Sequence, residues 1–396
     1  MTDLEATGKH TVHYLDNSAT TPLSQAAKEA IIRTMDVYGN PSSLHRAGQE
    51  AEKYLSQARA DLLSALGVRP RQGGTFLFTS CGSESNSTAL LGTAYAKSRR
   101  DATRILTSDS EHPSVARVME MLEADGFEVI RIPTKGGALD TDAIERALDR
   151  KIFLASFMLV NNETGALYDV KDAFSRIRRR YPDVITHCDA VQGFMKVPFT
   201  PASLGADLIS VSAHKLHAPK GVGGLYIAPE LLRAKKIVPF LRGGGQESGL
   251  RSGTENLIGI SAFGASVADL IARQEENKTA VNELRRYAEE QLAALPVRIN
   301  RPAVTIPHII NITLPDIKSE TMLHHLSAKD VYVSSGSACS SHSHHPSTTL
   351  LAFGLTPHDA DCSLRISMSA YNTMEDIDAL TAALADGIEH LVKIRH

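Results

Sequence analysis

The fold class of this chain is decided by one run, SVSAHKLHAPKG at residues 210–221. A β-rich run over residues 207–211 stops there and meets a polar segment that favours neither strand nor helix. Lys215 stands at this predicted strand end. A lysine in such a place can bond covalently to an aldehyde when its ammonium group is desolvated or crowded by cations. Hydroxyl and cationic donors suited to a phosphate flank it: Ser212, His214 and Lys220.

A carboxylate ends the preceding apolar run, Asp189 in the sequence HCDAVQ at residues 187–192. Lysine and carboxylate together are what a pyridoxal 5'-phosphate (PLP) site needs. The lysine holds the aldehyde, and the acid keeps the ring nitrogen protonated so that the ring accepts electrons. The alternative for Lys215 alone is a solvated lysine that follows a buried strand.

Apolar runs of strand length alternate with helical patterns in the N-terminal part of the chain. This alternation predicts crossover units and a mainly parallel sheet. One helix is predicted from residue 51 to residue 66, where apolar residues recur at helical spacing and Gly67 follows as a cap. The predicted strands are residues 75–78, 104–107, 128–131, 152–157, 184–187, 208–211 and 224–227.

The pattern changes after Thr254. Long helical sequence runs from residue 256 to about residue 295, and residues 374–392 form an amphipathic helical pattern at the end of the chain. Short strands are predicted between them, at residues 297–299, 308–314, 331–334 and 364–368. This part of the chain therefore predicts a smaller α+β domain.

A cysteine, Cys339, lies in the run VSSGSACSSHSHH at residues 333–345. Small polar neighbours predict an exposed thiol, and a reactive thiol needs exposure and a route to the thiolate. The alternative is a buried cysteine that packs as a small hydrophobe, which this composition disfavours.

Several separate motifs agree in order and spacing with one protein family. Besides Asp189, Gln192 and the Lys215 run, they are YLDNSATTP (14–22), GNPSS (39–43), FTSCGSESN (78–86), SEH (110–112), NNETG (161–165), RSGT (251–254) and SGSAC (335–339). The chain resembles the cysteine desulfurases, PLP enzymes of the class-V aminotransferase group with fold type I, in the subgroup with an extended cysteine loop.

The resemblance implies an α/β fold with a mainly parallel seven-stranded sheet between helices. It implies a large PLP-binding domain at residues 16–255. Residues 1–15 and 256–396 would then form a small α+β domain that carries the reactive-cysteine loop.

The resemblance also implies a phosphate site. Gly82 and Ser83 stand where a predicted strand passes into a predicted helix, and free backbone N–H groups at a helix start favour an anion. A simple helix cap is the alternative. In the family pattern Ser212 and His214 join these ligands, and Thr254 reaches the phosphate from the partner subunit, so that the site depends on a homodimer.

Four further residues are implied around the cofactor ring. Asp189 would pair with the ring nitrogen, while Gln192 and Asn162 would hydrogen-bond the ring hydroxyl. His112 would stack on the ring and help in proton transfer, which suits a side chain whose ordinary pKa is near neutral. Without the resemblance, His112 is a polar loop histidine, and Asn161 and Asn162 are turn formers.

An arginine, Arg365, interrupts the apolar predicted strand SLRIS at residues 363–367. A buried unpaired charge is costly, and a carboxylate is the natural partner of a guanidinium. The resemblance makes that partner the substrate's α-carboxylate, with Asn162 as a second substrate contact. A structural ion pair is the alternative.

The implied reaction converts L-cysteine to L-alanine. Lys215 would act as the base at Cα, and Cys339 as thiolate would take the sulfur as a persulfide for transfer to an acceptor protein, either a cluster scaffold or a thiolation enzyme. The alternatives are a selenocysteine lyase or an aminotransferase of the same fold, and a non-catalytic scaffold. Transamination does not need Cys339, and the presence of Lys215, Asp189 and His112 argues against a scaffold.

Composition gives no reason to expect nucleic acid or a membrane as a partner, because the formal net charge is −3 and no apolar stretch approaches about 20 residues. The first 13 residues lack the apolar core of a signal peptide. The four cysteines show no metal-type spacing and fit a reducing, cytoplasmic location. We expect no structural metal.

Some positions depart from the family pattern or add to it. Ser369 and Ala370 stand where relatives often carry Gly-Arg. Cys81 stands where glycine is common, either as a tolerated small residue or in a redox or relay role. The cluster of His342, His344 and His345 is a solvated loop tip or, alternatively, a metal ligand set or thiolate stabiliser.

Overall fold

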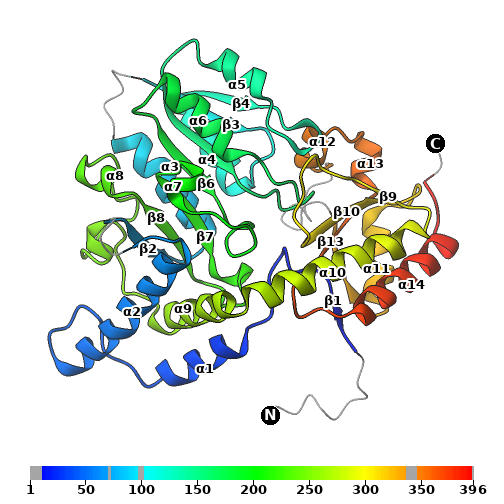
Figure 1. Cartoon of the computed structure of the whole chain (residues 1–396), viewed down its shortest axis with the longest axis horizontal. Helices are drawn as coiled ribbons and strands as arrows, with labels where there is room; N and C mark the ends of the chain where they lie inside the picture. Colours follow the sequence, from blue (N-terminus) through cyan, green and yellow to red (C-terminus); the bar gives the residue numbers. More distant parts are fainter. Residues whose placement is uncertain (1–10, 70–72, 97–101, 336–345, 395–396) are drawn as a thin grey trace. The chain divides into compact units, whose positions relative to one another are not determined.

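The structure is a computed structural model that describes residues 11–69, 73–96, 102–335 and 346–394. It contains two compact units (Figure 1). The larger unit comprises residues 20–162 and 166–274, and the smaller unit comprises residues 1–19, 163–165 and 275–396.

The larger unit is built on a seven-stranded sheet in the order β2-β8-β7-β6-β5-β3-β4. From β7 through β4 all neighbours run parallel, whereas β8 is antiparallel to both β2 and β7. The mainly parallel seven-stranded sheet predicted from the sequence is confirmed. Its strands are β2 (Thr75–Thr79), β3 (Arg104–Ser108), β4 (Glu128–Ile132), β5 (Ile152–Met158), β6 (Ile185–Asp189), β7 (Leu208–Ser212) and β8 (Gly223–Ile227).

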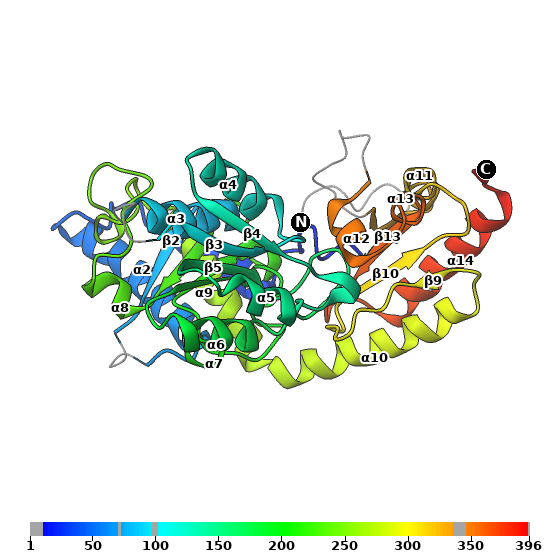
Figure 2. The same ribbon diagram turned by 90° about the horizontal axis from the view of Figure 1, so that it is seen from above.

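Helices cover both faces of this sheet, as Figure 2 shows for α3 and α4 on one face and α6 and α7 on the other. Every residue of β3, β5, β6, β7 and β8 is buried, as expected for strands covered on two sides. The helices of this unit are α1 (Gln25–Thr34), α2 (Arg46–Ala65), α3 (Gly82–Ala96), α4 (Pro113–Ala124), α5 (Thr141–Ala147), α6 (Val170–Arg180), α7 (Pro201–Leu204), α8 (Pro229–Arg233) and α9 (Leu257–Ala272).

The helix α9 explains why the domain boundary predicted at residue 255 differs from the unit boundary at residue 274. It packs against α1 and α2, so it belongs with the larger unit. The approach of α9 to α2 is close, because a Cβ on Gly264 would meet the Cα of Ala58 at 2.8 Å. As predicted, α2 ends before Gly67, whose φ of 68° is a left-handed conformation that glycine adopts at low cost.

The smaller unit is an α+β structure with its own apolar core. Its four-stranded sheet has the order β12-β13-β10-β9 with antiparallel neighbours, and β1 pairs with β11 in parallel. The strands are β1 (His13–Tyr14), β9 (Arg298–Ile299), β10 (Ile309–Thr313), β11 (Val331–Tyr332), β12 (Ser334–Ser335) and β13 (Ser363–Ser367). The helices are α11 (Ser319–Ser327), α12 (Thr348–Phe353), α13 (Pro357–Asp361), α14 (Met374–His390) and α10 (Gln274–Ala293), whose first residue falls in the larger unit. Among the described residues, no helix combines the length and apolar character needed to span a membrane.

Candidate functional site

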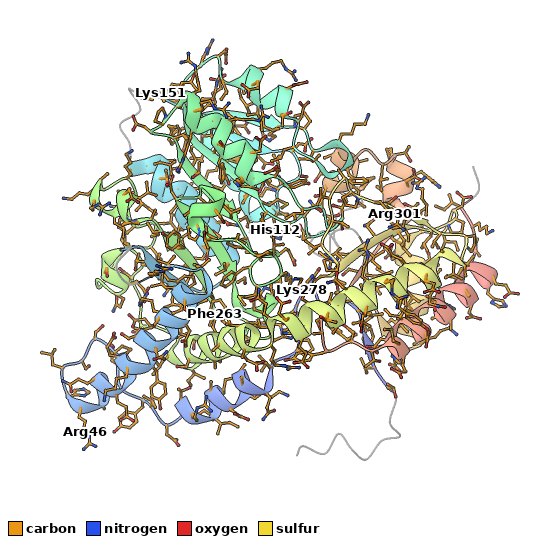
Figure 3. All side chains as sticks on the ribbon, viewed as in Figure 1. Arg46, His112, Lys151, Phe263, Lys278 and Arg301 are labelled. Carbon is orange, nitrogen blue, oxygen red and sulfur yellow. The ribbon has the colours of Figure 1, made fainter. Side chains whose placement is uncertain are left out.

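The predicted site residues of the larger unit gather at the carboxyl ends of its parallel strands. Asp189 is the last residue of β6, and Lys215 closes a 3-10 turn directly after β7. His112 follows β3, where it is the N-cap of α4 (Figure 3), and Asn162 follows β5. Because parallel strands share one carboxyl edge, residues distant in the sequence meet there, at the place where α/β sheets bind ligands.

Electrostatics show that three of these side chains are close neighbours. Burial lowers the pKa of His112 below its ordinary value. The negative charge of Asp189 opposes this shift, and the positive charge of Lys215 adds to it. The imidazole is therefore neutral at neutral pH and feels the charges of both a carboxylate and an ammonium group, which suits a role in proton transfer.

Asp189 is buried and held by two donors. The side-chain Nδ2 of Asn86 donates to its Oδ2 at 2.7 Å, and the backbone N–H of Val191 donates to its Oδ1 at 3.0 Å. Hydrogen bonds to the charged form stabilise a carboxylate in a buried place. A fixed negative charge at this strand end matches the predicted partner of a ring nitrogen.

The predicted phosphate ligands Gly82 and Ser212 are brought together by the sheet. A Cβ added to Gly82 would meet the Cβ of Ser212 at 3.3 Å and Val191 Cγ2 at 2.9 Å, so only glycine fits here without a shift. The Oγ of Ser212 is buried, and the described residues provide it with no hydrogen-bond partner. A buried hydroxyl in this condition is costly unless a ligand supplies the missing partner.

Two further predicted phosphate ligands, Ser83 and Thr254, are exposed. An ion pair connects their segments, because Arg251 Nε donates to Glu84 Oε1 at 2.8 Å. The Glu84 carboxylate also accepts from the backbone N–H of Ser80 at 2.7 Å. The loop that carries Thr254 is thus tied to the loop at the start of α3.

The remaining predicted ligands also lie at this edge. Burial and, after it, the positive charges of the neighbouring lysines, Lys215 first, lower the pKa of His214 to about 4. His214 is therefore a neutral side chain, and its Nδ1 lies 3.2 Å from the Thr20 Oγ1. Gln192 is buried, and its Oε1 accepts from the ammonium group of Lys196 at 3.3 Å.

This set of residues fits PLP. A buried carboxylate suits the ring nitrogen, and a lysine at the same edge suits the aldehyde. The unpartnered Ser212 hydroxyl, the close approach that Gly82 allows beside it and the backbone N–H groups that begin α3 suit a phosphate.

In the smaller unit, Arg365 lies in β13 with 3% of its side chain exposed. Its Nη2 donates to Asp16 Oδ1 at 2.7 Å, and Ser334 Oγ donates to the other oxygen, Asp16 Oδ2, at 3.0 Å. The structural ion pair that the sequence left open is therefore present. Binding of a substrate carboxylate by Arg365 stays a prediction.

Cys339 and the histidines His342, His344 and His345 lie outside the described residues. Of the two departures from the family pattern, Ser369 is buried and its backbone N–H donates to Asn372 Oδ1 at 2.9 Å. Cys81 is half-buried at the loop before α3 and is a free thiol.

Three residues next to the site were given no role from the sequence: Asn86, Ser114 and Glu111. Asn86 bonds Asp189, Ser114 bonds His112, and Glu111 lies buried close enough for Asp189 to influence it. Helical spacing is the signal that could have found Asn86, because it follows Ser83 by one turn of α3.

Glu111 should make stability depend on pH. Burial raises its pKa to about 8, while Ser108 Oγ and the Met158 N–H donate to its Oε1 at 2.6 and 2.9 Å. A folded-state pKa above the ordinary 4.5 means that the stabilising contribution is full below that value and is lost as pH rises through about 8. The melting temperature of Glu111→Gln, which resembles the protonated form, should therefore gain on that of the parent by a few degrees between pH 6 and pH 9, in thermal unfolding scans.

The exposed Glu120→Gln on the following helix α4 is the control, and it should show no pH-dependent difference. Melting curves of the parent and Glu111→Gln that stay parallel from pH 6 to pH 9 would contradict a raised pKa of Glu111.

Comparison with known proteins agrees with this geometry. Residues 13–380 match the family described as Aminotransferase class-V. The chain is 37% identical to a protein of Dictyoglomus turgidum named cysteine desulfurase IscS, over 96% of this chain and 95% of the relative. A solved structure titled NifS-like protein superposes with a TM-score of 0.88 at 32% identity, over 96% of this chain and 99% of the other.

Another solved structure, titled SspA in complex with cysteine, superposes with a TM-score of 0.79 at 29% identity, covering 91% of this chain and 99% of that chain. The family match spans most of the sequence, and the identity to the Dictyoglomus relative extends over nearly the whole length of both chains. The chain therefore belongs to the class-V aminotransferase family and, within it, to the cysteine desulfurases.

Proposed function

We propose that the protein is a PLP-dependent cysteine desulfurase that converts L-cysteine to L-alanine and passes the sulfur, held as a persulfide on Cys339, to an acceptor. The observation that carries the proposal is the meeting of Asp189, His112 and Lys215 at one sheet edge, beside the buried Ser212 hydroxyl that the described residues leave unpartnered. The cysteine in the related SspA structure supports the choice of substrate.

The larger unit would hold the cofactor. The phosphate would bind Gly82, Ser83, Ser212 and His214, while Asp189, Gln192 and Asn162 would contact the ring. When bound, PLP supplies an electron sink that lets the Cα–H bond and then the Cβ–S bond of an amino acid break.

The chain's own residues would do the rest. Lys215 would take the Cα proton as a base, and Arg365 with Asn162 would hold the substrate carboxylate. The Cys339 thiolate would attack the substrate sulfur, so that an S–S bond forms as the C–S bond breaks. The carbon product gains a proton and leaves as alanine, which balances the transfer of one sulfur atom to Cys339.

The site would be completed by a second copy of the chain. Thr254 is exposed on the loop tied to Glu84 through Arg251, which supports the proposal that it reaches the phosphate of a partner subunit in a homodimer. Sulfur-acceptor proteins, either a cluster scaffold or a thiolation enzyme, stay a proposal, and so does the cytoplasmic location.

The proposed function is tested by alanine and sulfide formation from L-cysteine with a thiol reductant. Cys339→Ala should lose at least about a hundredfold in both products relative to the parent, because nucleophilic transfer needs the thiolate. Ser341→Ala, two residues further along the same run, is the control and should retain parent activity.

Each other result identifies an alternative. Equal activity of Cys339→Ala and the parent would point to lyase or transaminase chemistry that does not use this thiol. Turnover of selenocysteine alone would favour a selenocysteine lyase. Absence of bound PLP from the purified parent would support a non-catalytic scaffold.

A further inference from the structure

We infer that Ser114 and Asn86 are positioning residues that fix the tautomer of His112 and connect its imidazole to Asp189. The inference deepens the proposed function, on which the role of His112 in proton transfer rests. All four residues lie in the larger unit, on α3, at the start of α4 and at the end of β6.

The contacts form an unbroken chain. Asn86 Nδ2 lies 2.7 Å from Asp189 Oδ2 and 2.9 Å from Ser114 Oγ. Ser114 Oγ lies 2.8 Å from His112 Nδ1, and the backbone nitrogen of Ser114 lies 3.1 Å from the same ring nitrogen. We call this chain the Asp189–His112 relay.

The donor and the acceptor of each hydrogen bond in the relay can be assigned from the groups at its two ends, the backbone N–H of Ser114 and the carboxylate of Asp189. A backbone N–H can only donate, so His112 Nδ1 must accept and carries no proton in the neutral ring. The Ser114 hydroxyl must then also donate to Nδ1. An ionised carboxylate can only accept, so the amide NH2 of Asn86 faces Asp189 and also donates to Ser114.

The orientation of Asn86 has a visible cost that supports this assignment. With its NH2 directed to Asp189 and Ser114, its Oδ1 is buried, and no described residue donates to it. A buried carbonyl oxygen in that state costs free energy. The amide is kept in place because the reverse orientation would set its oxygen against the carboxylate of Asp189.

The consequence is that neutral His112 carries its proton on Nε2. Protonation of Nδ1 would break both bonds from Ser114, so the relay works together with burial to keep the ring neutral. The charged groups that influence the imidazole are Asp189 from β6 and Lys215 from the turn after β7, and they act in opposite directions. His112 is therefore poised as an Nε2–H donor rather than as a base through Nδ1.

The relay is tested on the holoenzyme with 15N-labelled histidine, and the His112 signals are identified by their loss in His112→Gln. In the parent at pH 7 to 8, one ring nitrogen should show the shift of an unprotonated nitrogen and the other that of an N–H. Ser114→Ala should move the unprotonated signal toward a tautomer average and raise the pKa of His112. The kcat/KM of Ser114→Ala for alanine formation should fall about tenfold.

Ser114→Thr keeps the hydroxyl and should restore both readouts, whereas the exposed Ser175→Ala on α6 is the control and should change neither. Ring signals of His112 in Ser114→Ala that match the parent would overturn the relay, as would a protonated Nδ1 in the parent. Since the spectra need no cysteine, they decide the relay even if the desulfurase assay fails. Asn86→Ala should reproduce the Ser114→Ala spectrum, and a parent-like spectrum would exclude Asn86 from the relay.

Discussion

Replacement of Lys215 by alanine should reduce alanine formation from L-cysteine by about a thousandfold or more. The change removes both the proposed covalent anchor of PLP and the proposed base at Cα, so two separate contributions to the rate are lost together. The steady-state rate at saturating L-cysteine, with PLP added in excess, is the measurement, so that weak cofactor binding alone cannot account for the loss.

The covalent bond between Lys215 and PLP can be tested separately from the rate. Borohydride reduction of the parent should fix PLP on the peptide that contains Lys215, and mass spectrometry should find no such peptide in the variant. Lys171→Ala, an exposed lysine at the start of α6, is the control and should keep full activity. Labelling of a different lysine in the parent would show that Lys215 is not the anchor.

Asp189→Asn should lower kcat/KM by about a hundredfold to a thousandfold, because it removes the charge that keeps the ring nitrogen protonated while leaving the shape nearly unchanged. It should also cost stability of about 1–3 kcal/mol. Both carboxylate oxygens accept hydrogen bonds, from Asn86 and from the Val191 N–H, so the new amide NH2 must oppose one of these donors.

Rate and stability can be separated with two further variants. Asn86→Asp combined with Asp189→Asn restores a complementary donor and acceptor between positions 86 and 189, so it should recover part of the stability without recovering the rate. Asp207→Asn, at the amino end of β7 where the carboxylate binds Arg178 at 2.7 Å, should lose stability alone. A parent-like kcat/KM for Asp189→Asn would exclude Asp189 as the partner of the ring nitrogen.

The sheet could be predicted from the sequence because its signals are local. Each strand is a short apolar run bounded by turn residues, and all seven expected segments are strands in the structure. Because ligands of α/β sheets bind at the carboxyl ends of the parallel strands, Asp189 and Lys215 can then be placed at one site without knowledge of side-chain geometry.

The contacts that tune the site could not be predicted in this way, because they join residues far apart in the sequence. Asn86 and Asp189 are separated by 103 positions, and Asp16 and Arg365 by 349. Polar side chains such as Asn86 and Ser114 also carry no periodic pattern, since a helix start or a loop would accept them equally well. The boundary between the two compact units lies after residue 274 for a related reason, as the packing of α9 depends on α1 and α2.

The position of β8 has a consequence for synthesis of the chain. Among the described strands, β2 has β8 as its sole neighbour, yet 146 positions separate Phe78 from its β8 partner Gly224. While the ribosome extends the chain, the apolar strand TFLFT therefore has an unpaired edge until β8 has emerged. Such an edge pairs readily with other chains, so nascent chains stalled before residue 223 should be the aggregation-prone species and the natural clients of a chaperone.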